Sequence, residues 1–309
     1  MSGLIGILTG ILNHRGTPVS LNLLSSAIVS GKTVLITGAN TGLGLEAARH
    51  YAQLGASRVI LGVRTESKGE AAKQNIESSL ITRAGIAPPQ IEVWTIDLSS
   101  FASVQSFSKR VNEELDRLDI AVLNAAVSMS NFTLTKDGWD ESLQVNMLST
   151  ILLGLLIFPK LQASSAVGSN RLARLDFVAS RAHQYVKDGE SWQSEPNILQ
   201  TLNKDGVLHG TQRYGTSKLL LIYGIREIVK LATKSDGKPS VIVNYTCPGP
   251  CKSDLVREWQ GSVAGKIAVS AFHSTFCKTA EEGSRTIVWA TCLGEESHGK
   301  WIHNDQIEE

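Results

Sequence analysis

Residues 33–44 read Thr-Val-Leu-Ile-Thr-Gly-Ala-Asn-Thr-Gly-Leu-Gly. The first five form a short apolar run rich in β-branched side chains, which is typical of a buried parallel strand. Gly38, Gly42 and Gly44 follow, and then apolar residues recur at helical spacing up to Gly55. A glycine-rich turn between a strand and a helix lets the backbone approach a pyrophosphate, and the helix N-terminus offers N–H groups to it. This stretch therefore predicts a dinucleotide-binding fold.

The alternation of strand and helix continues along the chain. Short apolar runs predict further strands, and the longer periodic segments between them predict helices. The predicted strands are 58–63, 91–96, 119–123, 174–179, 240–245 and 300–303. The predicted helices are 66–80, 101–118, 139–158, 214–233 and 279–293. This order predicts an α/β protein with a Rossmann-like, doubly wound parallel sheet flanked by helices, in a single domain over 31–309.

The composition argues against several function classes. The 309 residues carry 30 Lys and Arg against 29 Asp and Glu, so the chain lacks the basic surplus of a nucleic-acid-binding domain. The four cysteines lack paired C-x-x-C spacing and the seven histidines are scattered, so we expect no metal site. We interpret the cysteines as free thiols of a reducing compartment, which favours a cytoplasmic location.

Residues 1–30 form a predicted leader before the first strand. Within it, residues 4–12 are apolar but too short to span a membrane, which takes about 20 apolar residues. The flanking residues do not fit a signal peptide. Two interpretations stay open for 4–12: a short helix packed on its own domain or on a partner, and a weak contact with a membrane surface.

The end of the second predicted strand indicates the type of cofactor. An acidic residue there would hydrogen-bond the adenosine ribose and repel a 2′-phosphate. This chain has Arg64 instead, whose planar, charged guanidinium suits a phosphate. The sequence therefore predicts NADP(H), with Asn40 as a second polar contact. The alternative is a solvated arginine at a strand end.

Tyr214 and Lys218 are four residues apart on a predicted helix, so the phenol and the ammonium lie on one face. A nearby ammonium favours the phenolate and lowers the pKa of the phenol, which predicts a proton-transfer pair. The spacing alone also fits an ordinary helix with two solvent-facing side chains. Ser180 follows a predicted strand, at the edge where open α/β sheets bind ligands, and is placed to donate to a substrate carbonyl.

The turn T-G-x-x-x-G-x-G at 37–44, the Tyr-x-x-x-Lys pair and their order resemble the short-chain dehydrogenase/reductase family over residues 31–303. The resemblance implies a carbonyl–alcohol oxidoreductase in which Tyr214 is the acid or base and Lys218 binds the nicotinamide ribose. It also implies that Ser180 polarises the carbonyl and that Asn146 holds a water in a proton relay. The implied cofactor contacts are Gly38, Asn40, Thr41, Gly42, Leu43, Gly44, Arg64, Asp97, Leu98, Asn124, Ala125, Tyr214, Lys218, Pro248, Gly249 and Ser253.

Several features distinguish this chain within that family. Val127 stands where the family has a glycine, and Asp97 has a second interpretation as a cap for the helix after Ser100. The segment 183–213, called the insert below, is long and resembles the retinol-dehydrogenase-like branch. We expect the insert, which carries Trp192, and a lid at 254–278 to shape substrate choice.

The closest resemblance is to fungal reductases of secondary metabolism. It implies a small, lipophilic, polyketide- or terpenoid-like substrate. Two other functions stay open: non-redox chemistry such as isomerisation, dehydration or cyclisation, and a sensor that binds NADP(H) without turnover. A homo-oligomer is compatible with the sequence.

Overall fold

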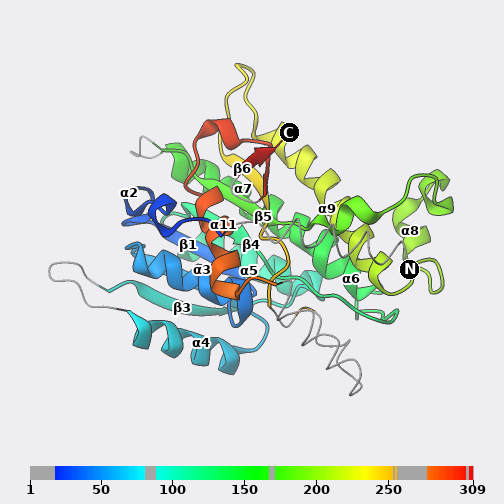
Figure 1. Cartoon of the computed structure of the whole chain (residues 1–309), viewed down its shortest axis with the longest axis horizontal. Coiled ribbons are helices and arrows are strands. Elements are labelled where there is room, and N and C mark those ends of the chain that lie inside the picture. Colours follow the sequence, from blue (N-terminus) through cyan, green and yellow to red (C-terminus); the bar gives the residue numbers. More distant parts are fainter. Residues whose placement is uncertain are drawn as a thin grey trace.

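The computed structural model describes residues 18–80, 88–166, 171–252, 277–303 and 306–308, together with Leu255. A single sheet of eight strands lies at its centre, with helices on both faces (Figure 1). The strands are β1 (Thr33–Thr37), β2 (Arg58–Val63), β3 (Gln90–Thr95), β4 (Ile120–Leu123), β5 (Arg174–Val178), β6 (Ile242–Cys247), β7 (Trp301–His303) and β8 (Gln306–Glu308). Their order is β3-β2-β1-β4-β5-β6-β7-β8, parallel except for the antiparallel pair β7–β8. The predicted fold class is confirmed.

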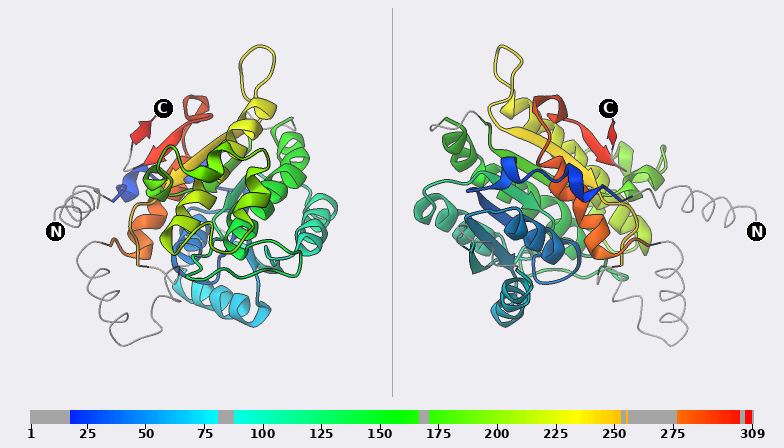
Figure 2. Two further views of the ribbon diagram at one scale, coloured as in Figure 1. Left: turned by 90° about the vertical axis from the view of Figure 1, so that its right-hand side faces the viewer. Right: turned by 60° about the vertical axis from the view of Figure 1, so that its left-hand side comes forward.

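Helices cover the sheet in two sets, each with its own hydrophobic core (Figure 2). The set on one face is α3 (Gly42–Gln53), α4 (Glu66–Ser79) and α11 (Ala280–Ala290). The set on the other face is α5 (Phe101–Glu114), α7 (Ser149–Ala166) and α9 (Thr211–Ala232). Because both faces are covered, β1 is buried along its whole length, as its apolar sequence predicts.

The predicted single helix over 139–158 is three consecutive segments. It comprises α6 (Glu141–Leu143), a π-helical turn over Gln144–Leu148, and α7, which continues to Ala166 through Pro159. The Thr150 hydroxyl donates to the Val145 carbonyl five residues earlier, at 2.8 Å, which fits the wider turn. Hydrophobic periodicity predicts that a helix exists, but it is too coarse to reveal one extra residue in a single turn.

The segment Glu141–Ala166 is long and apolar enough to cross a membrane, the one such segment among the described residues. Its side chains Leu153, Ile157 and Leu161 are fully buried against α5, α9 and the sheet. Such burial is expected for a helix in the core of a domain, which can be as long and apolar as a membrane-spanning helix.

The described part of the predicted leader packs on the domain. Val19 and Val29 are fully buried and Leu24 nearly so, in the core shared with α3 and α11. α2 (Ser26–Val29) lies in this segment. Arg285 of α11 donates to the Val19 carbonyl at 3.4 Å. Residues 18–30 therefore belong to the folded unit, whereas residues 4–12 lie outside the described residues.

The insert is built around a small core of its own. It contains two 3-10 turns, Arg181–Tyr185 at its entry and Ser191–Ser194, followed by α8 (Ile198–Leu202). Trp192 is only 4% exposed, and its indole packs in a cluster with Leu143, Leu202, Leu208 and Leu220. Trp192 thus holds the insert on α6 and α9, and the expectation that the insert shapes substrate choice stays a prediction.

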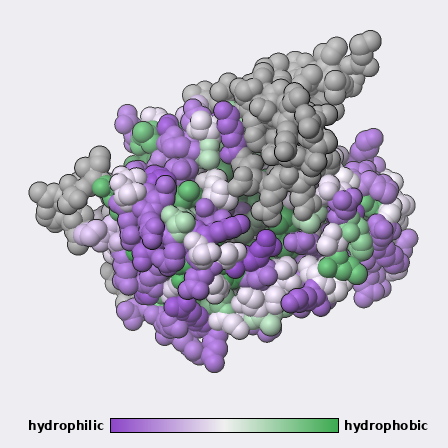
Figure 3. Space-filling view, turned by 90° about the horizontal axis from the view of Figure 1, so that it is seen from below, coloured by the Kyte–Doolittle hydropathy of each residue, from purple (hydrophilic) through white to green (hydrophobic). Residues whose placement is uncertain are grey.

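Polar residues cover most of the described face seen in Figure 3, and hydrophobic residues show there as small separate patches. This pattern agrees with the near balance of acidic and basic residues in the sequence.

Candidate active site

The order in which the chain adds strands to the sheet reverses between β1 and β4, which makes this position a topological switch point. The chain runs outward from β1 to β2 and β3 on one side, and from β4 to β5 and β6 on the other. In open α/β sheets a crevice forms at the carboxyl edge of such a point, and ligands bind there. The predicted glycine turn follows β1 and therefore lies at this position.

The glycine turn has the geometry of a backbone cradle. Gly38 and Gly42 have φ of 67° and 56°, in the left-handed region that glycine tolerates best. A Cβ at Gly44 would lie 2.4 Å from the Gly38 carbonyl oxygen and 2.6 Å from Nδ2 of Asn124. Only glycine therefore fits at position 44.

The turn leads directly into the N-terminus of α3. Thr41 is the N-cap residue, and its side chain makes no capping hydrogen bond to the first turn. The N–H groups in the first turn of a helix lack intrahelical acceptors and favour an anion. Asn40 and Leu43 beside them are partly exposed. A glycine cradle and an α3 N-terminus without a side-chain cap fit the phosphates of a dinucleotide.

Asn124 joins the ends of β1 and β4. Its Nδ2 donates to the Thr37 carbonyl at 2.9 Å, and the Thr37 hydroxyl accepts from the N–H groups of Asn124 and Ala125 at 3.0 and 3.1 Å. These bonds fix the floor of the crevice between the two strands. Asn124 thus ties the two neighbouring strands together.

Arg64 directly follows β2 and points largely into solvent. Its side chain is 55% exposed, and its nearest acidic group is the Glu141 carboxylate at 3.9 Å. An exposed pair at this distance contributes little to stability. The guanidinium is therefore available for a ligand at the carboxyl edge of β2.

Asp97 follows β3, with Leu98 buried behind it. The Asp97 carboxylate accepts hydrogen bonds from the N–H and the hydroxyl of Ser99 at 2.9 and 2.7 Å. The cap of α5 is Ser100, whose hydroxyl accepts from Ser103 N–H. Asp97 thus stabilises the turn after β3, and the alternative interpretation as the helix cap is wrong.

The loop after β6 carries Pro248 and Gly249. Gly249 has φ of 76°, which requires the conformational freedom of glycine. Cys251 donates from its thiol to the Pro248 carbonyl at 3.6 Å and pairs with Lys278 in a parallel bridge. Ser253 and most of the predicted lid at 254–278 lie outside the described residues.

Tyr214 lies in the first turns of α9, beside the loop after β5. Its hydroxyl is hydrogen-bonded to the Ser180 side chain, so the structure brings two predicted catalytic residues together. Burial raises the pKa of Tyr214 to about 12, opposed by the Ser180 hydrogen bond. The expected lowering of this pKa is corrected: desolvation of the phenolate outweighs the favourable contacts of the hydroxyl.

Lys218 lies one helical turn after Tyr214 and is almost fully buried. Its Nζ donates to the Val178 carbonyl at 2.8 Å and lies 5.8 Å from the centroid of the Tyr214 ring. Burial lowers the pKa of Lys218 to about 8, opposed by the nearby Cys247 thiol. The predicted pair therefore shares one buried site, with the ammonium bonded to the end of β5.

Asn146 sits in the π-helical turn and is buried against α9. Its Oδ1 accepts from Val127 N–H at 2.8 Å, and its Nδ2 donates to the Val127 carbonyl at 2.9 Å and to the Ser217 hydroxyl at 3.0 Å. The side chain thus ties the loop after β4 to α9. A valine at 127 does not prevent this contact, because only its backbone takes part.

Three further residues shape the site and were not identified from the sequence. A Cβ at Gly215 would lie 2.8 Å from the Ala182 carbonyl oxygen, so glycine allows α9 to approach the loop that carries Ser180. Nδ1 of His183 lies 2.6 Å from the Ser180 carbonyl oxygen and fixes the same loop. Ser217 links Asn146 to the Tyr214 carbonyl. The role of each residue depends on contacts between segments that are distant in the sequence. Only Gly215, directly after Tyr214, could have been noticed from the sequence.

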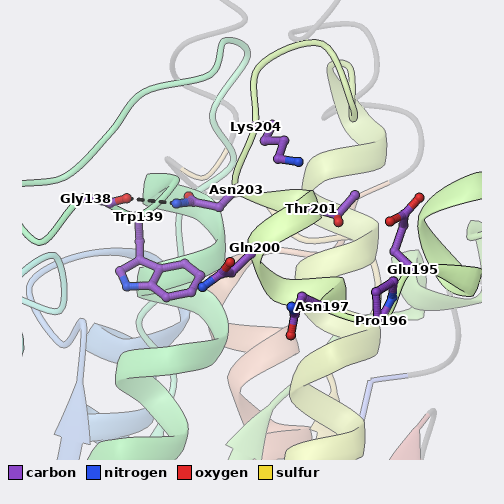
Figure 4. A pocket seen from close by; sticks show the side chains of 9 residues that line it. All are labelled: Gly138, Trp139, Glu195, Pro196, Asn197, Gln200, Thr201, Asn203 and Lys204. Carbon is purple, nitrogen blue, oxygen red and sulfur yellow. Dashed lines mark hydrogen bonds between the residues drawn. The ribbon is translucent and has the colours of Figure 1, made fainter.

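A pocket of about 570 Å³ opens beside the insert, between Gly138–Trp139 and α8 (Figure 4). Its other lining residues are Glu195, Pro196, Asn197, Gln200, Thr201, Asn203 and Lys204. None of the predicted site residues lines it, so it is separate from the Ser180–Tyr214–Lys218 cluster.

The chain is similar to known proteins along most of its length. The sequence profile described as short chain dehydrogenase matches residues 32–170. The short-chain dehydrogenase/reductase phmF of Phaeosphaeria nodorum is 41% identical over 284 residues, which are 90% of this chain and 79% of phmF. The short chain dehydrogenase sol3 of Alternaria solani is 35% identical over 309 residues, covering all of both chains.

Among solved structures, the Pseudomonas aeruginosa RhlG/NADP active-site complex has a TM-score of 0.65 at 21% identity. It covers 88% of this chain and 94% of that chain. This similarity shows the fold. The expected likeness to fungal short-chain reductases is confirmed by the curated relatives.

Proposed function

Since this chain belongs to the short-chain dehydrogenase/reductase family, whose oxidoreductases act on small molecules with a nicotinamide cofactor, we propose that it interconverts a carbonyl and an alcohol using NADP(H). The observation that carries the proposal is the hydrogen bond between the Tyr214 hydroxyl and the Ser180 side chain, beside the buried Lys218 ammonium. It gathers a proton donor, a second hydroxyl and a cation at the carboxyl edge of the sheet.

Residues along that edge would hold the cofactor. The glycine cradle and the α3 N-terminus suit its diphosphate, and Arg64 suits a 2′-phosphate. Asp97, Ala125 and Gly249 follow the carboxyl ends of β3, β4 and β6, at the edge of the sheet where adenosine and nicotinamide contacts are expected. The structurally similar RhlG was solved as a complex with NADP, which also supports NADP(H) as the cofactor. When bound, the cofactor supplies or accepts the hydride.

The protein's own part is orientation and proton transfer. A substrate oxygen beside Ser180 and Tyr214 would accept two hydrogen bonds, which polarise a carbonyl. Tyr214 then donates its proton to the developing alkoxide, and acts as the base in the reverse direction. Its raised pKa keeps the phenol protonated at neutral pH, ready for reduction.

Lys218 and Asn146 lie next to the Ser180–Tyr214 pair and assist it in two different ways. With a pKa lowered to about 8, Lys218 can release or take up a proton close to neutral pH, which suits a relay partner of Tyr214. Asn146 holds the π-helical turn on α9 through Ser217. We propose that Asn146 thereby keeps α9 in place, with its role in a water relay remaining a prediction.

The proposal is tested with a panel of ketones, aldehydes and alcohols that includes polyketide- and terpenoid-like compounds. Turnover is followed by NADPH absorbance and by product analysis. We expect at least one carbonyl to be reduced with one NADPH consumed per product. Product formed without net NADPH consumption would instead assign non-redox chemistry. Tight NADPH binding without any turnover would assign a sensor.

A further inference from the structure

A buried ion pair lies immediately next to the proposed proton donor. Nη1 of Arg213 donates to Oδ2 of Asp140 at 2.9 Å, and the two side chains are 5% and 2% exposed. Nη2 of Arg213 donates to the Leu208 carbonyl of the insert at 2.8 Å. The guanidinium also lies 5.3 Å from the centroid of the Phe132 ring. Arg213 thus connects the first turn of α9 with two separate segments of the chain.

Asp140 is the junction of these segments. Its Oδ1 caps α6 by accepting from Leu143 N–H at 3.0 Å, and its own N–H donates to Oδ1 of Asn203 at 2.6 Å. Nδ2 of Asn203 donates to the Gly138 carbonyl at 2.9 Å (Figure 4). Asp140 therefore fixes the start of the helical segment that carries Asn146, and it contacts α9 through its carboxylate and the insert through its backbone N–H.

The catalytic turn is held on both sides of Tyr214. Arg213 binds Asp140 before it, and Ser217 binds Asn146 after it. Both bonds reach the same segment, α6 with its π-helical turn. A buried ion pair gains little net stability, because desolvation offsets the attraction. The planar guanidinium of Arg213 binds two acceptors at once, the Asp140 carboxylate and the Leu208 carbonyl, and this restricts its orientation.

We propose that Asp140 and Arg213 are a positioning pair. They hold α9 against the loop after β5, so that the Tyr214 hydroxyl stays bonded to Ser180, and they couple the insert to this alignment. This inference rests on the proposed function, in which Tyr214 transfers the proton. Neither residue is assigned a contact with substrate or cofactor.

The test uses the full chain, with NADPH and a carbonyl compound that the panel described above shows to be reduced. Arg213→Lys keeps the charge but loses the planar guanidinium that binds Asp140 and Leu208 together, and Asp140→Asn keeps the cap but loses the charge. We expect kcat to fall roughly tenfold to a hundredfold, the size of effect that a misplaced catalytic group has. The Kd for NADPH should stay within about twofold, because the glycine cradle is untouched. Circular dichroism confirms that each variant is folded at the assay temperature.

The matched control is Arg58→Lys. Arg58 binds both carboxylate oxygens of Glu92, at 2.6 and 3.0 Å, with side chains that are 24% and 20% exposed, toward the amino ends of β2 and β3. This variant should keep the wild-type kcat. Equal loss in Arg58→Lys and Arg213→Lys would overturn the proposal, as would full activity of folded Arg213→Lys and Asp140→Asn.

A double variant separates positioning from general damage. In a Tyr214→Phe background, Arg213→Lys should cost little further rate, because the group that it positions is gone. The same loss in both backgrounds would contradict the proposed role. If Tyr214→Phe alone keeps near-wild-type turnover, the proposed function fails instead, so the two failures are distinguishable.

Discussion

Burial, rather than the neighbouring cation, controls the protonation of Tyr214. The Lys218 ammonium donates to the Val178 carbonyl, and desolvation raises the pKa of Tyr214 to about 12. The spacing in the sequence correctly predicts that the two side chains lie on one helical face. It does not predict how strongly burial desolvates them. That quantity depends on how closely α9 packs on the sheet.

Lys218 should make stability depend on pH. Its folded pKa of about 8 lies below its usual value of 10.5, so the folded state disfavours the ammonium. This penalty, about 3 kcal/mol by linkage, is complete below about pH 8 and gone above about pH 10.5. Urea unfolding of wild type and Lys218→Met should show the wild type gaining stability relative to the variant as pH rises through this window. A difference that is flat with pH would contradict the burial effect.

Arg64 should select the cofactor. Charge-assisted hydrogen bonds contribute about 1.5–3 kcal/mol, so Arg64→Asp should weaken NADPH binding about tenfold to a hundredfold. NADH affinity should change little, because NADH lacks the 2′-phosphate. Fluorescence titration with both cofactors measures this. Arg58→Asp, at the opposite end of β2, is the control for a general charge effect, and equal NADPH affinity of wild type and Arg64→Asp would exclude Arg64 from the phosphate site.

At the scale of elements, the strands follow the sequence closely. β1 and β2 occupy the predicted residues, because continuous β-branched runs fit only a strand buried on both faces. β8 was not predicted, since three exposed residues paired to β7 have no local apolar pattern. The π-helical turn and the core around Trp192 were also missed. Both are set by contacts between segments far apart in the chain.

The approach of α9 to the Ser180 loop should depend on Gly215. In Gly215→Ala the new methyl would meet the Ala182 carbonyl oxygen at 2.8 Å, so the loop or the helix must shift. We expect kcat to fall at least about tenfold while the protein remains folded. Gly224→Ala is the comparison on the same helix, because the atoms nearest its new methyl, at 2.7 and 2.8 Å, belong to the Ile151 side chain and not to backbone. Loss of activity in Gly224→Ala but not in Gly215→Ala would refute this packing argument.

At the scale of the whole molecule, the boundary of the folded unit lies before residue 31. Deleting residues 1–30 removes Val19, Leu24 and Val29 from the core shared with α3 and α11. We expect this truncation to lower the melting temperature by several degrees or more, since each buried aliphatic side chain contributes about 1.5–3 kcal/mol. Deleting only residues 1–17 keeps these three side chains and is the control. Equal melting temperatures for the two truncations would contradict the assignment.

Membrane contact through residues 4–12 and homo-oligomerisation remain predictions from the sequence. Vesicle co-sedimentation of the full chain and of the chain without residues 1–17 measures the first. Light scattering of the full chain measures the second.

The central claim is that Tyr214 transfers the proton in an NADP(H)-dependent carbonyl reduction. Single-turnover reduction of a true substrate by Tyr214→Phe, compared with wild type, tests it most directly. The ring still packs and the cofactor cradle is unchanged, so NADPH affinity should be retained. The rate should fall about 10²–10⁴-fold, the usual contribution of a positioned acid. A near-wild-type rate of NADPH oxidation and alcohol formation in Tyr214→Phe would contradict the account.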